Sequence, residues 1–162
     1  MKVIPAKIPN KRASMPCYVD DEDYDMLARC KWHTTHGYAM TNVRSSNPKH
    51  KSKRCHASMH QVILWCPKGY EIDHKDGKRN NNQKSNLRIC TRSQNQFNVR
   101  LQRNNTSGFK GVSYRKSIGK YRARIMKNFK MYELGEFVIA AEAHDVYKKA
   151  SKKLHGEFGR IK

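Results

Sequence analysis

Long apolar runs are missing from this sequence of 162 residues. A helix that crosses a bilayer needs roughly 18 or more consecutive apolar residues, and no stretch approaches that length, so we expect no membrane partner. The first residues, MKVIPAKIPNKRASMPCYVDD, include basic side chains but no continuous apolar segment, so no secretory signal is expected. These absences predict a cytoplasmic protein.

Paired cysteines are missing as well. The five cysteines include no CxxC pair and their number is odd, so buried or idle thiols in a reducing compartment are the simplest interpretation. A zinc site stays open as an alternative, although its spacing matches no regular zinc-finger pattern. That site would draw on Cys55, His56, His60 and Cys66.

Acidic residues are scarce in the middle of the chain. Between residues 26 and 132 lie 24 of the 34 Lys and Arg but only three of the 13 Asp and Glu, so the whole net charge of +21 resides there. Such an excess is typical of proteins that bind a phosphate backbone, and a merely basic, soluble surface is the alternative. The three acids are Glu71, Asp73 and Asp76, all within the heptapeptide EIDHKDG.

The first hundred residues predict short elements. Five acids in DDEDYD precede MLARCKW and indicate a short helix, because acids in the first turn favour the helix dipole. The remaining patterns predict a strand at 37–43, a polar loop at 45–54, a short apolar element at 59–65, a turn-rich stretch and a helix at 92–102.

The pattern changes after a linker-like segment, RNNTSG. Three short strands are predicted at 109–116, 119–127 and 130–137. In the middle strand apolar residues alternate with Arg122 and Arg124, which predicts one apolar and one basic face. An amphipathic helix that ends near Gly156 follows, so this half is a small α+β module. Its predicted apolar face consists of Ala143, Val146, Tyr147, Ala150 and Leu154.

The acidic heptapeptide has the residues of a hydrolytic centre. His74 can act as a general base near neutral pH, and the carboxylate of Asp73 and the amide oxygen of Asn95 suit a hard divalent cation such as Mg²⁺. Such a cation would polarise water and turn repulsion of phosphate into attraction. Asn86 either orients the histidine ring or closes the loop between strand and helix.

Two alternatives apply to the same residues. Asp76-Gly77 is typical of a hairpin turn, and the whole heptapeptide can be read as a turn without chemistry. A calcium-binding EF-hand loop is excluded, because Lys75 occupies its third position and no glutamate stands at its twelfth.

The segment MHQVILWCPKGYEIDHKDGKRNNNQKSNLRICTRSQNQFN resembles the HNH motif of phage-type homing endonucleases, whose core runs approximately DHxxG…NNxxxNLRxxTxxqN. Asn86 follows His74 by 12 positions, and Asn95 follows Asn86 by 9. Asparagine in the third place is similar to the H-N-N variant. The later segment, from SGFKGVSYRK to KLHGEF, resembles the AP2 DNA-binding domain.

The resemblance implies an α+β fold with a ββα-metal nuclease domain at 1–97, a linker at 98–106 and an AP2-like domain at 107–162. It implies that His74 is the general base, that Asp73 and Asn95 bind the metal, and that Asn86 supports the geometry. Glu71 and Asp76 have no catalytic counterpart. Gln61 replaces the arginine usual after the histidine that corresponds to His60, so no substrate contact is carried over to that position.

DNA contacts are expected from the linker and from the open face of the AP2-like sheet. The linker contributes Arg100 and Arg103, which would follow a groove, and the sheet contributes Lys110, Arg115, Arg122 and Arg124. Base preferences do not carry over, because Ser113, Ile118 and Tyr121 replace tryptophans or arginines common in that family.

We therefore expect a site-specific DNA endonuclease of the homing type in a phage or bacterial host cell. It would use one Mg²⁺ or Mn²⁺ per active site and double-stranded DNA as substrate, and it would nick one strand as a monomer without an obligate protein partner. A non-catalytic DNA-binding regulator is the alternative, and an RNA-associated basic protein is a second one, although the sheet lacks an adjacent aromatic pair for base stacking.

Overall fold

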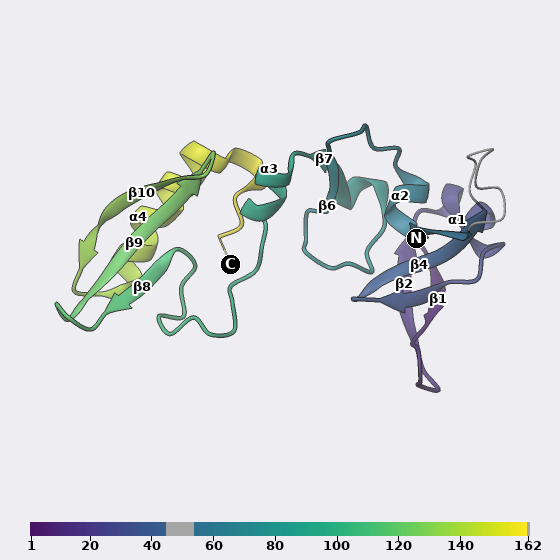
Figure 1. The fold of residues 1–162 in the computed structure, drawn as a ribbon, viewed down its shortest axis with the longest axis horizontal. Helices are drawn as coiled ribbons and strands as arrows, with labels where there is room; N and C mark the ends of the chain where they lie inside the picture. The colour runs from purple at the N-terminus through teal and green to yellow at the C-terminus, as the bar shows by residue number, and fades with distance from the viewer. Residues whose placement is uncertain (45–53, 162) are drawn as a thin grey trace. The chain divides into compact units, whose positions relative to one another are not determined.

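A computed structural model of the chain describes residues 1–44 and 54–161, and the polar loop predicted at 45–54 lies almost entirely outside them. The chain divides into two compact units, Met1–Ile89 and Cys90–Lys162 (Figure 1). The fold is mixed α+β. None of the described helices combines the length and apolar character that crossing a bilayer requires.

The first unit contains a five-stranded sheet in the order β2-β1-β3-β4-β5. Only one of its strands, β4, was predicted. Strand β1 contains Pro5, which pairs with Pro16 of β2, and proline inside a run argues against a strand when the sequence alone is read. The five strands are Lys2–Lys7, Ser14–Val19, His33–Thr35, Tyr38–Arg44 and Arg54–Ser58.

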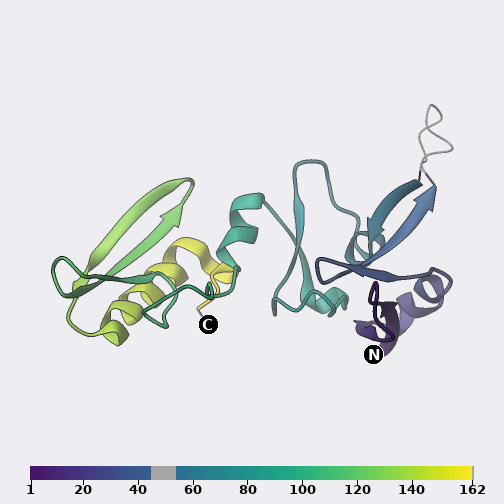
Figure 2. The same ribbon diagram turned by 60° about the horizontal axis from the view of Figure 1, so that its bottom comes forward.

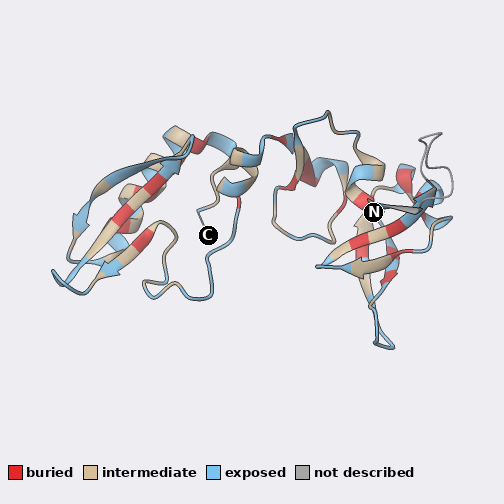
Figure 3. Ribbon diagram, in the orientation of Figure 1, coloured by how far each residue is buried: buried red, intermediate tan, exposed pale blue. Residues whose placement is uncertain are grey.

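Two helices, α1 (Asp21–Ala28) and α2 (Met59–Ile63), pack on this sheet. The first confirms the helix predicted from the acidic run. The indole nitrogen of Trp32 donates to the carbonyl of Leu27 at 2.8 Å, which ties the end of α1 to the next strand. Figure 3 shows the buried residues along these elements. The core consists of Ile4, Ala6, Cys17, Val19, Leu27, Trp32, Ala39 and Met59.

Strands β6 (Glu71–His74) and β7 (Leu87–Cys90) form a separate two-stranded sheet. The long loop between them ends in a 3₁₀ turn, Lys84–Asn86. The amide of Lys75 donates to the carbonyl of Asn86 at 2.9 Å and closes the base of this loop.

In the second unit, helix α3 spans Arg92–Phe97 and is shorter than the helix predicted at 92–102. The ammonium group of Lys110 donates to the carbonyls of Phe97 and Val99 at 2.6 and 2.7 Å. The ring of Phe97 stacks on His155 with centroids 3.7 Å apart. These contacts turn the chain away from the helix axis. They join residues that are distant in sequence, so no local pattern predicts them.

The three strands and the helix predicted for the second half are confirmed. The sheet order is β10-β9-β8, with antiparallel pairs, and helix α4 lies along one of its faces (Figure 2). Ala123 and Ile125 are buried, whereas Arg122 and Arg124 are only partly so. The elements are β8 Val112–Arg115, β9 Lys120–Lys127, β10 Lys130–Phe137 and α4 Ala140–His155.

The buried face of α4 differs from the predicted one towards its end. Ala143 and Tyr147 are buried as expected, whereas Val146, Ala150 and Leu154 are only partly buried, and Ser151 and His155 continue the buried row. The imidazole of His155 bonds to the carbonyl of Met126 at 2.7 Å, so a polar side chain is satisfied inside the core.

Candidate active site

Strand β6 places Asp73 and His74 next to each other, and both are buried, with exposed fractions of 5% and 4%. Arg88 on the paired strand β7 donates from Nε and Nη2 to the Oδ2 atom of Asp73, at 2.9 and 2.7 Å. A buried carboxylate needs such a charged partner, because desolvation is costly otherwise. The carboxylate proposed as a metal ligand is therefore held in a fixed direction by Arg88.

His74 has polar and aromatic neighbours from three elements. Its Nε2 atom is 3.2 Å from the Oδ1 atom of Asn82, and its ring centroid is 5.2 Å from that of His60 and 6.1 Å from that of Tyr38. Burial lowers the pKa of His74 and outweighs Asn82 and the two nearby aspartates, which act in the opposite direction. The neutral imidazole, the form that accepts a proton, is thus favoured.

His60 is the second histidine of this cluster. Burial, and then the charge of His74, lower its pKa to about 4. Its Nε2 atom lies 3.0 Å from Oγ of Ser58. Gln61 completes a capping box with Ser58 at the start of α2, so the residue that replaces the family's arginine has a structural task here.

The hydrogen bonds of Asn86 favour one of the two roles considered for it. Its side-chain amide donates to Asp76 and to the carbonyl of Asn81, and its Oδ1 atom accepts from the amide of Asp76. Burial would raise the pKa of Asp76, but hydrogen bonds from Asn81, the Lys78 amide and Asn86 outweigh it and lower that pKa. Asn86 and Asp76 together close the loop.

Asn95 lies on α3, in the second unit, and is half-buried. A capping box fixes the start of this helix, since the Thr91 hydroxyl accepts from the Gln94 amide at 3.2 Å and the Gln94 side chain accepts from the Thr91 amide at 2.8 Å. The helix backbone thereby holds Asn95 at a defined turn.

The donor atoms fit a hard cation better than zinc. A carboxylate and an amide oxygen are ligands that Mg²⁺ accepts. Among the described residues, no group of three or more His, Cys, Asp or Glu side chains is arranged to hold a metal. Of the alternative zinc set, the Cys55 side chain lies outside the described part, and the Cys66 thiol donates to the Pro67 carbonyl at 3.8 Å.

The side chains of the second unit that were predicted to contact DNA differ in their partners and in their burial. Arg115 pairs with Glu136 at 2.7 Å and Arg122 lies 3.9 Å from Glu133, both on the sheet. Lys110 is engaged with α3 carbonyls, and burial, followed by Arg160, lowers its pKa to about 8. Arg124 is half-buried.

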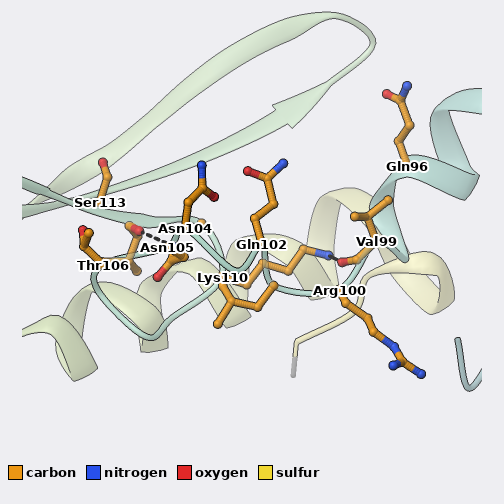
Figure 4. A pocket seen from close by; sticks show the side chains of 12 residues that line it. Gln96, Val99, Arg100, Gln102, Asn104, Asn105, Thr106, Lys110 and Ser113 are labelled. Carbon is orange, nitrogen blue, oxygen red and sulfur yellow. Dashed lines mark hydrogen bonds between the residues drawn. The ribbon is translucent and has the colours of Figure 1, made fainter.

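Part of the predicted linker folds against the C-terminal module. A hollow of about 520 Å³ lies between linker residues and the start of β8 (Figure 4). Asn105 donates to the carbonyls of Phe109 and Val112, both at 3.2 Å. Arg100 and Arg103 are exposed, and Figure 4 shows the Arg100 side chain pointing away from Gln102 and Lys110.

Several residues of the site were missed from the sequence. From the sequence, Asn82 was interpreted only as part of a turn-rich stretch, and Arg88 only as one position of the HNH motif. Tyr38 contacts His60 at 5.3 Å between centroids, and the Arg79 guanidinium lies 4.6 Å from the Tyr38 ring. The run of three asparagines was a usable signal for Asn82, but no local pattern connects Tyr38 to the motif.

Strand β6, paired with β7, carries Asp73 and His74, and the short capped helix α3 with Asn95 follows them in the chain. The pattern that defines the family described as HNH endonuclease matches residues 65–97. The chain contains an HNH endonuclease domain and is a DNA-cleaving hydrolase.

Two viral relatives were found. Protein 3.8 of Escherichia phage T7 is 32% identical over 96 residues, which cover 59% of this chain and 78% of that protein. An uncharacterized HNH endonuclease of Acanthamoeba polyphaga mimivirus is 34% identical over 92 residues, 57% of this chain but only 46% of that protein. No solved structure matches the chain.

Proposed function

We propose that the chain is a site-specific, homing-type endonuclease that hydrolyses one phosphodiester bond with His74 as general base. Asp73 and Asn95 are the protein ligands of a single Mg²⁺ or Mn²⁺ ion. The observation that carries this proposal is His74 itself, a buried imidazole kept neutral beside the oriented carboxylate of Asp73.

Each residue has one task in this mechanism. His74 takes a proton from the attacking water, and Asn86 with Asp76 keeps the loop closed around it. Asp73 supplies a carboxylate oxygen and Asn95 an amide oxygen. The bound cation would neutralise charge on the leaving oxygen. The products would carry 3′-hydroxyl and 5′-phosphate ends.

The second unit is proposed to bind double-stranded DNA in the manner of an AP2 domain, through the sheet face opposite α4. Arg115, Arg122 and Arg124 belong to that face. Lys110 was expected there too, and its contacts with the carbonyls of Phe97 and Val99 favour a role in holding α3 instead. Arg100 and Arg103 are proposed to follow the DNA backbone.

We further propose action as a monomer, without an obligate protein partner, in the cytoplasm of an infected cell. One catalytic set in each chain supports a nick in one strand, and the viral origin of the relatives supports this location. The domain limits at residues 97 and 107 remain a prediction.

Supercoiled plasmid that carries a target site, incubated with Mg²⁺, tests the proposal. Open circles are the expected product. Linear DNA would contradict the single nick, and unchanged plasmid would contradict the enzyme. His74→Ala should bind the same DNA without cutting it, and wild-type cleavage by this variant would refute the assignment of the base.

A further inference from the structure

We propose that Asn82 is a positioning residue, which fixes the nitrogen of His74 that carries the proton, and that the N-terminal sheet holds Asn82 in place. The inference rests on the proposed role of His74 as general base. Asn82 is only 1% exposed.

The two ends of the Asn82 amide have different partners. Its Nδ2 atom lies 3.4 Å from Sδ of Met59, and its Oδ1 atom lies 3.2 Å from Nε2 of His74. A thioether sulfur accepts hydrogen bonds but donates none, so the NH₂ end of the amide faces Met59 and the oxygen faces the imidazole. The Nε2 atom of neutral His74 must therefore carry the hydrogen.

This choice determines which ring nitrogen can act as the base. With the hydrogen on Nε2, the lone pair of the neutral ring lies on Nδ1. A turned ring would place a C–H group against the amide oxygen and lose the hydrogen bond. Asn82 thus keeps both the tautomer and the ring orientation that proton transfer from a water at Nδ1 needs.

The N-terminal sheet fixes the backbone of Asn82. Tyr18 of β2 exchanges backbone hydrogen bonds with Asn80 and Asn82, both of 2.8 Å. Just after β2, the carboxylate of Asp20 accepts from the Lys84 amide at 2.7 Å and from the Gln83 side chain at 3.1 Å. The asparagine-rich loop thus covers the outer edge of the sheet, where β2 is the last strand.

The variant Asn82→Leu removes the acceptor with little change of volume, and Asn80→Ala is its matched control. Asn80 links the same loop to β2 through the Pro16 carbonyl at 2.8 Å. We expect Asn82→Leu to lower kcat about 10- to 100-fold at unchanged Kd for DNA, and Asn80→Ala to cleave like wild type. Asn82→Asp keeps an acceptor oxygen, but its charge raises the pKa of His74, so it should retain most of the cleavage at higher pH.

A ¹⁵N spectrum of the His74 ring provides a second measurement. In the wild type only Nε2 should show the protonated signature, whereas Asn82→Leu should show a mixture of tautomers. If Asn82→Leu kept wild-type kcat while His74→Ala was inactive, the inference would fail and the proposed base would stand. If Asn82→Asp lost as much activity as Asn82→Leu at every pH, Asn82 would be merely structural. Wild-type activity of His74→Ala would refute the base itself.

A different observation carries a second proposal. We infer that the hairpin of β1 and β2 contacts the phosphate backbone of DNA. A hollow of about 580 Å³ at this hairpin is lined by four exposed cations, Lys7, Lys11, Arg12 and Lys31, together with Trp32, and by no Asp or Glu.

The cationic hollow is not apparent from the net charge of the N-terminal segment. The first 25 residues contain four Lys and Arg and five Asp and Glu. In the fold the acids Asp21, Glu22 and Asp23 lie on α1 and pair with the Met1 amino group or with Lys84. Among the ion pairs of the described residues, none involves the four cations of the hollow.

Salt dependence of DNA binding tests the hollow. Lys7→Gln/Lys11→Gln/Arg12→Gln should reduce the slope of log K against log [salt] by about 2 to 3, because each phosphate contact contributes roughly one. The control Lys149→Gln/Lys152→Gln/Lys153→Gln removes the same charge from exposed positions of α4 and should change the slope by less than about 1. Equal slopes for the two triple variants, or a loss of affinity confined to duplex RNA, would overturn the proposal.

Discussion

At the scale of single residues, the site depends on buried polar side chains that satisfy one another's hydrogen bonds. Arg88 holds Asp73, Asn82 holds His74, and Asn86 holds the loop through Asp76. Buried polar groups are stable only when their hydrogen bonds are made. Each side chain of the proposed site therefore has a partner whose removal tests it separately.

Arg88→Met should lower the free energy of unfolding by about 3 kcal/mol, because it takes the guanidinium from a buried carboxylate. Urea unfolding of both proteins measures the loss. Lys148→Met is the control, since its ion pair with Asp145 is exposed, screened by solvent, and should contribute little. Equal losses in the two variants would mean that the Asp73 pair contributes no more than a surface pair.

His60 should make the fold sensitive to acid. Its pKa is about 4 in the fold against 6.5 ordinarily, so below pH 6.5 the unfolded chain binds a proton that the folded chain does not. The free energy of unfolding should fall by about 3 kcal/mol between these pH values. His60→Gln should flatten this dependence in urea titrations, whereas His56→Gln, at an exposed position, should not.

At the scale of elements, short helices here depend on their ends. Helix α3 has only six residues, too few to be stable by itself. Its capping box and the contacts of Phe97 with Lys110 and His155 hold it at both ends. The proposed metal ligand Asn95 depends on both.

Thr91→Val should destabilise α3 by about 1 kcal/mol, because the hydroxyl that accepts from the Gln94 amide is lost while the shape is kept. We expect cleavage at limiting Mg²⁺ to fall, with recovery at higher Mg²⁺, and Thr91→Ser to behave like wild type. An unchanged dependence of cleavage on Mg²⁺ concentration would mean that the helix cap does not affect metal binding by Asn95.

Gly111 and Gly108 form a matched pair in the second unit. Both have a positive φ, of 75° and 74°, but a Cβ atom at Gly111 would lie 2.1 Å from the Tyr147 ring, whereas nothing lies within 4 Å at Gly108. Gly108→Ala should cost about 1 to 2 kcal/mol for the backbone alone. Gly111→Ala should cost about 2 kcal/mol more, because it separates β8 from α4. Thermal unfolding compares the two, and equal losses would contradict the packing argument.

At the scale of the whole molecule, structure that depends on local patterns could be predicted from the sequence, whereas contacts between distant residues could not. Alternation in Tyr121–Ile125 predicted β9, and motif spacing identified Asp73 and His74 as candidates. Strands β1 and β2 of the N-terminal sheet contain Pro5 and Pro16, which argue against strands when the sequence alone is read. The contacts that hold Asn82 against strand β2 and beside His74 were missed because Tyr18 and Asn82 are distant in sequence. Periodicity carries no information about such pairs.

Chemistry and DNA binding should therefore be separable in the full chain. Arg115→Ser/Arg122→Ser/Arg124→Ser removes cations from the open face of the sheet, and should raise Kd for target DNA at least about 100-fold. The glutamate pairs of Arg115 and Arg122 are partly exposed, so the fold should survive their loss. At saturating DNA, kcat should stay within about twofold of wild type, because His74 and Asp73 belong to the other unit. A collapse of kcat at unchanged Kd would place these arginines in the chemistry of cleavage rather than in binding.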